Sequence, residues 1–415
     1  MTPTGRTRPT RRAPGPTGRN KLRLMRATLS DPAPALDELR RDYGPIVEMG
    51  IGGLRLAVIG DPAVMREMFA MGADAYRWGH RYNVVGVRLV VGKGSMIVSD
   101  GADHGRRRRA SQSAFSRPRL DGLIPMIVDR TDVAIDALAR SSSPGQEVDL
   151  YPVGRALILG ITLDAFFGPR LAARADEIGA LLQRPQDFIE APALEQLPHP
   201  WPFSRRAKVR ADRRALDQIV GEEITLRRAD PSAARDDLLG ALIADPSLSI
   251  DEIHDQAATA IGAGFDTTSA ALAWMLVRVG RSPDAWARLK AEADGVLGLP
   301  GSATPRGRST LDDLTYSRNV VQESLRLHPA GLVGVRQAAR DIELGGFTVR
   351  RGTLVVWSPH LAETPRRGRI RCASTPTASS ASPASNRHSP TRHGCHSAVA
   401  RTCASGSGSH RWSWP

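Results

Sequence analysis

The sequence predicts a mainly helical protein that also carries small β-sheets, which places it in the mixed α+β class. Apolar residues recur at helical spacing over six stretches, the last of which is much longer than the others. These stretches are 121–140, 153–167, 171–183, 208–227, 235–244 and 248–280. Only two others, 44–60 and 342–358, have the β-prone runs broken by glycine that are typical of strands joined by turns.

Turn and capping residues define the elements outside these helices. The stretch "GPIVEMGIGGLRLAVIG" (44–60) predicts a hairpin, and "DPAVMREMFA" (61–70) predicts a helix with proline in its first turn. The proline-rich "LPHPWPFS" (197–204) predicts a loop between two helices. The stretch 342–358 predicts two short strands around a turn, and we find no internal repeat.

Charge is concentrated at the two ends of the chain. The formal net charge is +14, of which residues 1–26 contribute +8 and residues 363–415 contribute +7, leaving about −1 for the middle. The basic ends lack interleaved aromatic residues, so we expect no nucleic-acid partner. Hydrophobic residues make up 41% of the 415 residues, which is enough for a large buried core.

Composition divides the chain into three parts. Residues 1–24 are rich in Pro, Thr and Arg and predict a disordered basic tail, whereas 25–362 predict one folded domain. Beyond residue 362, Ile370 and Val399 are the only members of the Ile/Leu/Val/Met/Phe set. Such a segment buries too little apolar surface to offset its ordering entropy, so 363–415 predict a disordered tail.

The cysteines also suggest where the protein works. All three, Cys372, Cys395 and Cys403, lie beyond residue 362, so the predicted domain has no disulfide. No apolar run reaches the ~18 residues that a membrane span needs, and the N-terminus lacks the apolar region of a signal peptide. We therefore expect a cytoplasmic monomer without a membrane partner.

The long helix predicted over 248–280 has an unusual centre. Ser249 and Glu252 fit a capping box at its start. Its middle, "AGFDTTS" (263–269), places Gly264, Asp266 and Thr267 in an otherwise apolar pattern. Glycine costs about 1 kcal/mol inside a helix, and Asp and Thr compete for backbone hydrogen bonds there. The alternative is a tolerated polar patch at a helix contact, but the cluster favours a functional site with a local widening or kink.

A second motif follows on a later helix. In "NVVQESLRLHPAG" (319–331), Glu323 and Arg326 stand three residues apart, a spacing that allows a charge-assisted pair. Taken alone the motif is weak, because an ordinary surface ion pair has the same spacing and contributes little.

Taken together, the motifs resemble those of the cytochrome P450 family, the haem-thiolate monooxygenases. "AGFDTTS" is followed about 57 residues later by "ESLRLHP" and then by "VRQAARDIELGGFTVRRGTLVVWSPHLA". Upstream, "GKGSMIVSDGADHGRRRRASQSAFS" (92–116) resembles the family's helix that carries a His and an Arg. The resemblance covers roughly 25–362, most closely the soluble bacterial members, and implies the cytochrome P450 fold.

The resemblance also implies roles for particular residues. Asp266 and Thr267 would deliver protons to dioxygen on the oxygen side of the haem, where Gly264 would also lie. His104, Arg108 and Arg336 would contact the haem propionates, although the arginine run around Arg108 must also include residues that face water. Glu323 and Arg326 would form a structural pair beneath the haem.

The implied cofactor is heme b, and the implied reaction inserts one oxygen atom of O2 into an apolar organic substrate. Electrons would come from external partners of the ferredoxin and ferredoxin reductase type, because 415 residues leave no room for a fused reductase. The apolar flanks of the long helix and the 184–204 region would shape the substrate pocket.

One essential part of the family pattern is missing from this chain. The axial cysteine thiolate, whose electron donation favours O–O cleavage, sits in F-x-x-G-x-x-x-C-x-G, and neither Cys395 nor Cys403 has those neighbours. We therefore assign no metal ligand, and the meander, the ligand loop and the following helix are absent. Cys403 as a ligand in a rearranged loop would lack the Gly-rich backbone. A zinc cluster of "HGCH", Cys403 and His410 lacks C-x-x-C spacing.

A change of reading frame explains the missing part. Residues 363–379 can be translated back into degenerate codons and read again in a frame that starts at the third base of each codon. This shifted frame permits the sequence D-P-x-x-W-P-D-P-L-R-F-D-P-D-R-F. The same shift over 392–415 permits F-G-G-G-x-H-x-C-I-G, with cysteine spanning the codons of Cys403 and Ala404. We interpret 363–415 as a frameshifted segment and expect the written chain to be inactive. The alternative is a catalytically dead, P450-like small-molecule binding protein.

Overall fold

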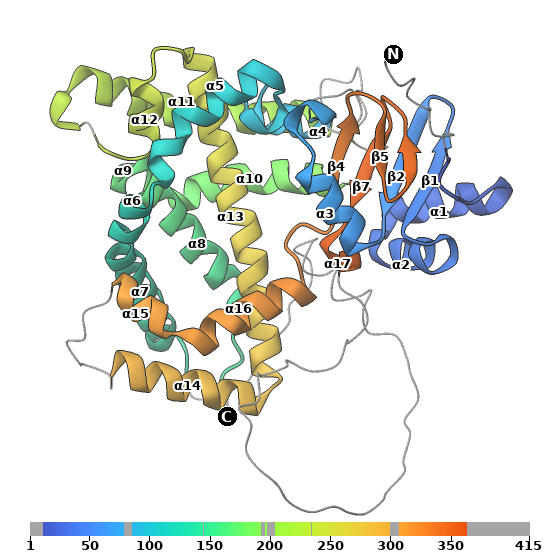
Figure 1. The fold of residues 1–415 in the computed structure, drawn as a ribbon. Helices are drawn as coiled ribbons and strands as arrows, with labels where there is room; N and C mark the ends of the chain where they lie inside the picture. The colour runs from blue at the N-terminus through green and yellow to red at the C-terminus, as the bar shows by residue number, and fades with distance from the viewer. Residues whose placement is uncertain are drawn as a thin grey trace, which may run out of the picture.

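The computed structural model describes residues 11–78, 85–143, 145–191, 196, 204–233, 235–298 and 307–362. The predictions for 1–10 and 363–415, and most of the loop predicted at 197–204, lie outside these described residues. Figure 1 shows a large helical part beside a smaller part that contains the strands. The mainly helical α+β class is therefore confirmed.

The larger sheet has five strands in the order β1-β2-β7-β4-β3, and β5 and β6 form a separate hairpin. Strands β2 and β7 are parallel, whereas the other neighbours in the larger sheet are antiparallel. The strands are β1 (Ile46–Ile51), β2 (Leu54–Ile59), β3 (Tyr76–Arg77), β4 (Gly334–Ala338), β5 (Ile342–Leu344), β6 (Phe347–Val349) and β7 (Leu354–Trp357).

The hairpin predicted at 44–60 is confirmed as β1 and β2, in which Ile46 lies opposite Ile59. The prediction of two strands over 342–358 is wrong, because three are present. Gly345 and Gly346 form the first turn with φ of 54° and 78°, values that favour glycine. Gly352, at φ 84°, lies in a second turn that lets β7 join the larger sheet.

Each predicted helical stretch is helical in the structure, although 121–140 and 171–183 are each divided between two helices. The α-helices in the first half of the chain, predicted or not, are α1 (Gly18–Ser30), α2 (Pro32–Tyr43), α3 (Pro62–Ala70), α4 (Val85–Val91), α5 (Gly101–Gln112), α6 (Arg117–Gly122), α7 (Ile124–Ser141), α8 (Leu150–Phe167), α9 (Pro169–Ala172) and α10 (Ala175–Glu190). The others are α11 (Arg205–Ala229), α12 (Leu238–Ala244), α13 (Ile250–Gly280), α14 (Pro283–Leu297), α15 (Arg308–Asp313), α16 (Thr315–Leu327) and α17 (Pro359–Ala362).

Helix α13 runs through the middle of the helical part (Figure 1). It packs against α4, α8, α11, α12, α14 and α16, and its largest contact is with α8. The main hydrophobic core lies between α13 and helices α5, α8, α9, α10, α11 and α12, and includes Leu163, Phe167, Ile219 and Ile261. Helices α8 and α13 are also long and apolar enough to cross a membrane.

The ordered structure begins earlier than the composition predicts. Helix α1 starts at Gly18, inside the segment predicted to be a tail up to residue 24. Before it, the carbonyl of Pro14 accepts a hydrogen bond from Glu48 N at 2.9 Å, and that of Arg11 accepts one from Thr348 N at 2.9 Å. These hydrogen bonds are made by backbone groups and do not depend on side-chain composition. The Arg-rich composition of the segment therefore could not predict them.

The centre of α13 also differs from its prediction. The capping box is confirmed, since Ser249 Oγ accepts from Glu252 N at 3.2 Å and Ser249 N donates to Glu252 Oε2 at 2.9 Å. The predicted widening is wrong, because the helix is α-helical at every position from Ile250 to Gly280. Thr267 Oγ1 donates back to Ala263 O at 2.8 Å, so its hydroxyl is satisfied without opening the helix.

Candidate active site

Asp266 and Thr267 lie at the middle of α13, where the helix has an open face. Ala263 and Thr267 are one turn apart and both are exposed, although the helix is central in the fold. Phe265, between them, points the other way and is 2% exposed in the core. The sequence-predicted pair therefore stands at the border between the packed side of α13 and an uncovered side.

Gly264 faces a neighbouring helix. A Cβ atom placed on it would come within 3.2 Å of Thr162 Cγ2 of α8, a contact tighter than most real ones. The glycine therefore allows α8 and α13 to pack closely. This packing explains why glycine is tolerated inside the helix, and a role in cofactor binding stays a prediction.

Asp266 is held by a cation that sequence reasoning missed. Arg155 Nη1 of α8 lies 3.6 Å from Asp266 Oδ1, and the guanidinium stands 4.6 Å from the centre of the Phe265 ring. Burial is the main cause that raises the pKa of Asp266, while Arg155 and the Gln186 amide lower it. A signal was available, because Arg155 is the only cation in the apolar pattern of 153–167.

A second carboxyl group belongs to the same neighbourhood. Glu190 ends α10, and its pKa is raised to about 7, mainly by burial and then by the charges of Asp266 and Asp187. Its side chain remains accessible to water at the helix end, so the protein encloses it only in part. Sequence reasoning did not single out Glu190, because two of the charges that shift its pKa, Asp266 and Arg155, come from other helices.

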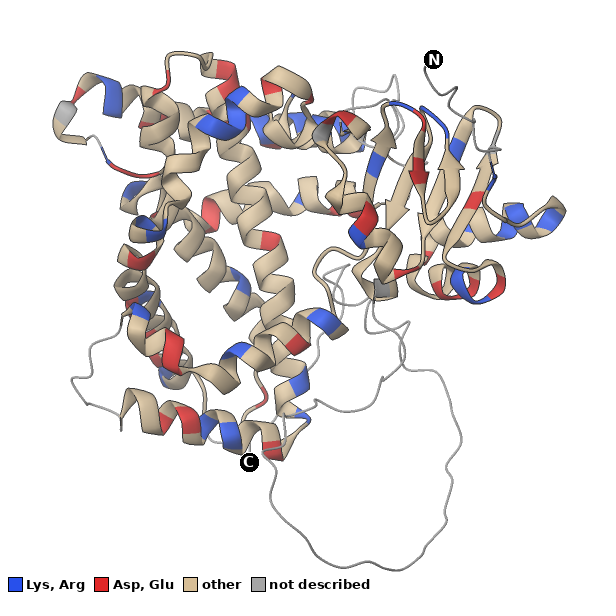
Figure 2. Cartoon of the chain, viewed as in Figure 1, with Lys and Arg blue, Asp and Glu red and all other residues tan. Residues whose placement is uncertain are grey.

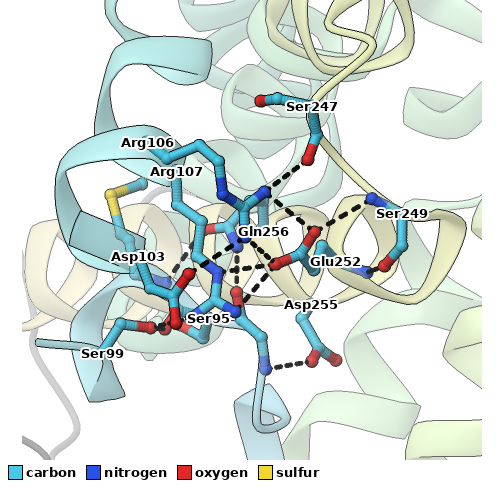
Figure 3. Close-up of polar contacts among 12 residues, drawn as sticks. Ser95, Ser99, Asp103, Arg106, Arg107, Ser247, Ser249, Glu252, Asp255 and Gln256 are labelled. Atoms are coloured by element: carbon cyan, nitrogen blue, oxygen red, sulfur yellow. Dashed lines mark hydrogen bonds and ion pairs between the residues drawn. The ribbon is translucent and has the colours of Figure 1, made fainter.

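His104 and Arg108 lie one turn apart on α5, as the sequence predicts. The Nδ1 atom of His104 lies 2.9 Å from the carbonyl of Met96 and must donate to it, which leaves Nε2 for another group. Arg108 is exposed. In contrast, the two preceding arginines of the run turn toward α13, where Arg106 and Arg107 both contact Glu252 (Figure 3).

Glu252 is the centre of this contact. Its Oε1 atom accepts from Arg106 Nη2 at 2.5 Å and from Arg107 Nη2 at 2.8 Å, and its pKa is lowered to about 2, mainly by Arg106. Arg107 also bonds Ser99 Oγ, just before α5. This Glu252 clamp fixes α5, and therefore His104 and Arg108, to the start of α13.

The segment before α5 is tied to the same end of α13. Asp255 Oδ2 accepts from Gly94 N at 2.7 Å, and Gln256 Oε1 accepts from Met96 N at 3.0 Å (Figure 3). The hydroxyls of Ser95 and Thr259 lie 2.6 Å apart in the core. The carbonyl that orients His104 is therefore held by α13 as well.

The guanidinium of Arg336 has no carboxylate partner among the described residues. Its guanidinium lies 3.0 Å from the centre of the Trp78 ring, and Nη1 donates to Val335 O at 2.9 Å. Burial lowers its pKa to about 10. Trp78 N in turn donates to Asp100 Oδ1 at 2.5 Å, directly before α5. The fold thus brings Arg336 of β4 toward the helix that carries His104 and Arg108.

Glu323 and Arg326 form the pair that their spacing suggests. Arg326 Nε and Nη2 donate to the two carboxylate oxygens of Glu323, each at 2.6 Å. The side chains are 20% and 28% exposed, so the pair is only half-buried. Its position beneath a haem stays a prediction.

The described residues fit a haem on two of its sides. Arg336 supplies a half-buried cation for a propionate, with no carboxylate partner among the described residues, and α13 supplies an uncovered face with a hydroxyl and a carboxyl group. The axial side differs, because the described residues contain no cysteine and no group of metal ligands. All three cysteines lie in 363–415, outside these residues.

Comparisons with known proteins agree with this geometry. The family model described as cytochrome P450 matches residues 22–363. Cytochrome P450 139 of Mycobacterium tuberculosis is 32% identical over 79% of this chain and 75% of its own length. Cyclooctat-9-en-7-ol 5-monooxygenase of Streptomyces melanosporofaciens is 32% identical over 76% of this chain and 68% of its own length. Pentalenene oxygenase of Streptomyces avermitilis is 28% identical over 76% of this chain and 70% of its own length.

A solved structure supports the same fold. The protein described as retinoic acid bound cyanobacterial CYP120A1 superposes with a TM-score of 0.71 and 22% identity, covering 85% of this chain and 78% of the other. The match to the family model spans residues 22–363, which is most of the chain. The chain belongs to the cytochrome P450 family of haem-dependent monooxygenases.

Proposed function

We propose that the folded part of this chain is the substrate-binding and proton-delivering part of a monooxygenase that acts on an apolar organic molecule. The observation that carries the proposal is the uncovered middle of α13, where Asp266 and Thr267 border an otherwise apolar helix. Such a face, central in the fold and lined by few polar groups, is typical of a site for an apolar ligand.

Each predicted residue has a defined task in this proposal. Arg336, His104 and Arg108 would hold the propionates of heme b. Thr267 holds a proton at Oγ1, and Asp266 exchanges protons with it, because a half-buried carboxyl group of raised pKa can both donate and accept. Glu323 and Arg326 hold the end of α16 in place. The haem, when bound through a cysteine thiolate, supplies the activation of dioxygen.

The substrate class follows from the apolar face and from the relatives. Two relatives are named for cyclooctat-9-en-7-ol and for pentalenene. We infer a substrate of similar apolar character, bound between α13 and the elements around α10. Electrons come from an external ferredoxin and its reductase, and the protein works as a cytoplasmic monomer without a membrane or nucleic-acid partner. Figure 2 supports the last point, since acidic and basic residues are interspersed over the described part.

The written chain lacks the axial ligand, and we attribute this to a change of reading frame near residue 362. The shifted reading permits the pattern F-G-G-G-x-H-x-C-I-G and the meander before it, with a decisive codon that encodes either Cys or Arg. Without these parts the chain binds haem weakly and has no normal monooxygenase activity. The second candidate function, a binding protein that keeps the pocket without the metal, is favoured only by the intact geometry of α13 and its neighbours.

Two preparations test this proposal, the written chain and a chain whose frame is restored after codon 362. The reduced, CO-bound spectrum of the restored chain should show the thiolate-type Soret band, and that of the written chain should not. A thiolate-type band from the written chain would disprove the frameshift account. Binding of an apolar fluorescent probe without haem by the written chain would support the binding-protein alternative.

A further inference from the structure

The short segment before α5 is held to α13 by the side-chain amide of one glutamine. Gln256 is 1% exposed. Its Oε1 atom accepts from Met96 N at 3.0 Å, and its Nε2 atom donates to Gly94 O. The amide therefore pairs with the backbone on both sides of Ser95, as a residue of a neighbouring strand would. These two bonds fix the backbone of the segment in one orientation relative to α13 (Figure 3).

The carbonyl of Met96 is held in the turn that follows. It opens the 3-10 helix η2 (Met96–Val98) and accepts from Ser99 N at 3.3 Å. The same oxygen lies 2.9 Å from His104 Nδ1. Because a carbonyl oxygen can only accept, Nδ1 must carry a proton. The turn that Gln256 anchors therefore decides which imidazole nitrogen of His104 is protonated.

The second nitrogen of His104, Nε2, has a different role. Among the described residues no group forms a hydrogen bond with it. A neutral imidazole carries one N–H, so when Nδ1 holds that proton, Nε2 can only accept. An ionised carboxylate can also only accept. The neutral side chain therefore offers no hydrogen bond to a propionate, and Nε2 can hold one only after it takes up a second proton.

We propose that Gln256 is a positioning residue that commits His104 to hold a carboxylate only when the imidazole is doubly protonated. The second proton comes from water and stays on Nε2, which donates it as a hydrogen bond to the carboxylate. The inference rests on the proposed function for the identity of this carboxylate, a haem propionate. The protonated nitrogen of His104 can be measured without haem.

Charged groups of α5 lie one turn to either side of His104. Asp100 precedes it by four residues, and the exposed Arg108 follows it by four. Arg107 follows it by three, but its guanidinium is paired with Glu252 of α13. Of these two arginines, Arg108 is therefore the one whose charge faces water beside His104.

Elements packed against α5 add one further cation. Arg336 of β4 stands over the ring of Trp78, whose backbone N donates to Asp100 Oδ1 at 2.5 Å. Helix α12, η2 and the 3-10 helix η3 (Ser113–Phe115) contain no charged residue. Burial lowers the pKa of Arg336 to about 10, so it keeps most of its charge below pH 9. A pH dependence of carboxylate binding between pH 7.5 and 8.5 therefore points to His104.

The first measurement is the ratio of the two neutral tautomers of His104. It is read from the imidazole nitrogen-15 NMR shifts of the full chain at pH 8.5, and the signals are assigned by their loss in His104→Asn. The unsubstituted chain should show mainly the Nδ1–H tautomer. In Gln256→Leu the ratio of Nδ1–H to Nε2–H should fall roughly fivefold, the equivalent of one ordinary hydrogen bond.

A second variant protects the test against poor folding. Gln256→Glu keeps an acceptor for Met96 N but loses the donor for Gly94 O, so its ratio should fall less than that of Gln256→Leu. Circular dichroism checks the fold of both variants. If Gln256→Leu does not fold, a ratio that stays unchanged in Gln256→Glu contradicts the inference.

Thr259→Val is the matched control. It also removes a buried contact between α13 and the same segment, the one at 2.6 Å between the hydroxyls of Thr259 and Ser95, but it leaves the backbone bonds of Gln256 in place. The tautomer ratio of His104 should therefore stay unchanged. An equal fall in Thr259→Val would show that loosened packing, and not the amide of Gln256, controls the imidazole.

The second measurement uses iron-free protoporphyrin IX and its dimethyl ester, which lacks free carboxylates, with the frame-restored chain. Between pH 7.5 and 8.5 an ordinary imidazole is mostly neutral. If one proton is taken up with the carboxylate, the affinity for protoporphyrin IX should fall about tenfold over this range. The affinity for the ester should not change. Fluorescence titration measures both, and His104→Asn should remove the pH dependence.

Three results would overturn the inference: His104 mainly in the Nε2–H form, a tautomer ratio that does not move in the Gln256 variants, or a pH-independent affinity for protoporphyrin IX. If the frame-restored chain binds neither porphyrin, the proposed function fails, and the tautomer ratio alone decides the role of Gln256. If protoporphyrin IX binds equally at both pH values, only this inference fails.

Discussion

The two halves of helix α13 have a similar apolar composition and opposite surroundings. In the first half and at the centre, the buried residues are Ile253, Gln256, Ala257, Ala258, Thr259, Ile261 and Phe265. After Ser269, which is buried, every position from 270 to 278 is only half-buried, and Val279 is the one further buried residue of the helix. The first half is also tied by Glu252, Asp255 and Gln256 to α5 and the segment before it.

The difference shows what a helical pattern does and does not determine. Both halves form helix, because helix formation depends on local backbone bonds and on the cap at Ser249. Whether the side chains of a helix are buried depends on the elements that pack against it. The described residues bury the second half of α13 incompletely. Only 17% of the most apolar 18-residue window of α13 is buried.

The largest expected difference concerns apolar truncations in the two halves. Ile261→Ala removes a side chain that is 0% exposed and should cost about 3 kcal/mol of unfolding free energy. Leu276→Ala, in the half-buried part, should cost about 1 kcal/mol, because less apolar area is lost from the interior. Urea unfolding of both variants measures this. Equal losses would show that the second half is as well covered as the first.

The next effect concerns the Glu252 clamp. Glu252→Gln leaves Arg106 and Arg107 without their shared carboxylate and should cost about 2 kcal/mol, less than a fully buried pair because the arginines keep some solvent. Glu177→Gln, which breaks an exposed pair with Arg174, should change little.

The same clamp predicts a pH dependence. Because the pKa of Glu252 is lowered to about 2, its contribution is complete above its unfolded value and is lost as the pH falls toward 2. The difference in unfolding free energy between the unsubstituted protein and Glu252→Gln should therefore shrink as the pH is lowered from 6 to 3. A constant gap across this range would contradict the assigned role of the ion pair.

The smallest effect compares two threonines on the same helix. Thr259→Val removes a hydroxyl that contacts Ser95 Oγ in the core and should cost about 1 kcal/mol. Thr267→Val removes an exposed hydroxyl that bonds its own helix, so its cost should be within about 0.5 kcal/mol. Thermal unfolding measures both. A larger loss for Thr267 would mean that the open face of α13 is covered by residues outside those described.

Sequence reasoning found the parts of the site that are encoded locally. Asp266 and Thr267 stood out because they interrupt an apolar helical pattern, and Glu323 and Arg326 because their spacing alone brings them together. The capping box of Ser249 was visible for the same reason. Each of these features lies within four residues of chain, so no knowledge of the fold was needed.

The contacts that sequence reasoning missed join distant segments. Arg106 meets Glu252 across 146 residues, and Arg155 meets Asp266 from another helix. In the run of four arginines nothing local distinguishes Arg106 and Arg107, which turn inward, from Arg108, which stays exposed. The choice depends on where α13 places Glu252, and therefore on packing.

The sequence by itself determined the helical class, the order of the elements, the family and the absence of the cysteine motif, because each is written in local patterns and spacings. The tertiary structure alone decided which side of α13 is packed, that Arg336 has no carboxylate beside it among the described residues, and that Arg155 of α8 lies beside Asp266. These properties depend on the distances between chain segments and on the exclusion of water, and both arise only when the helices pack together.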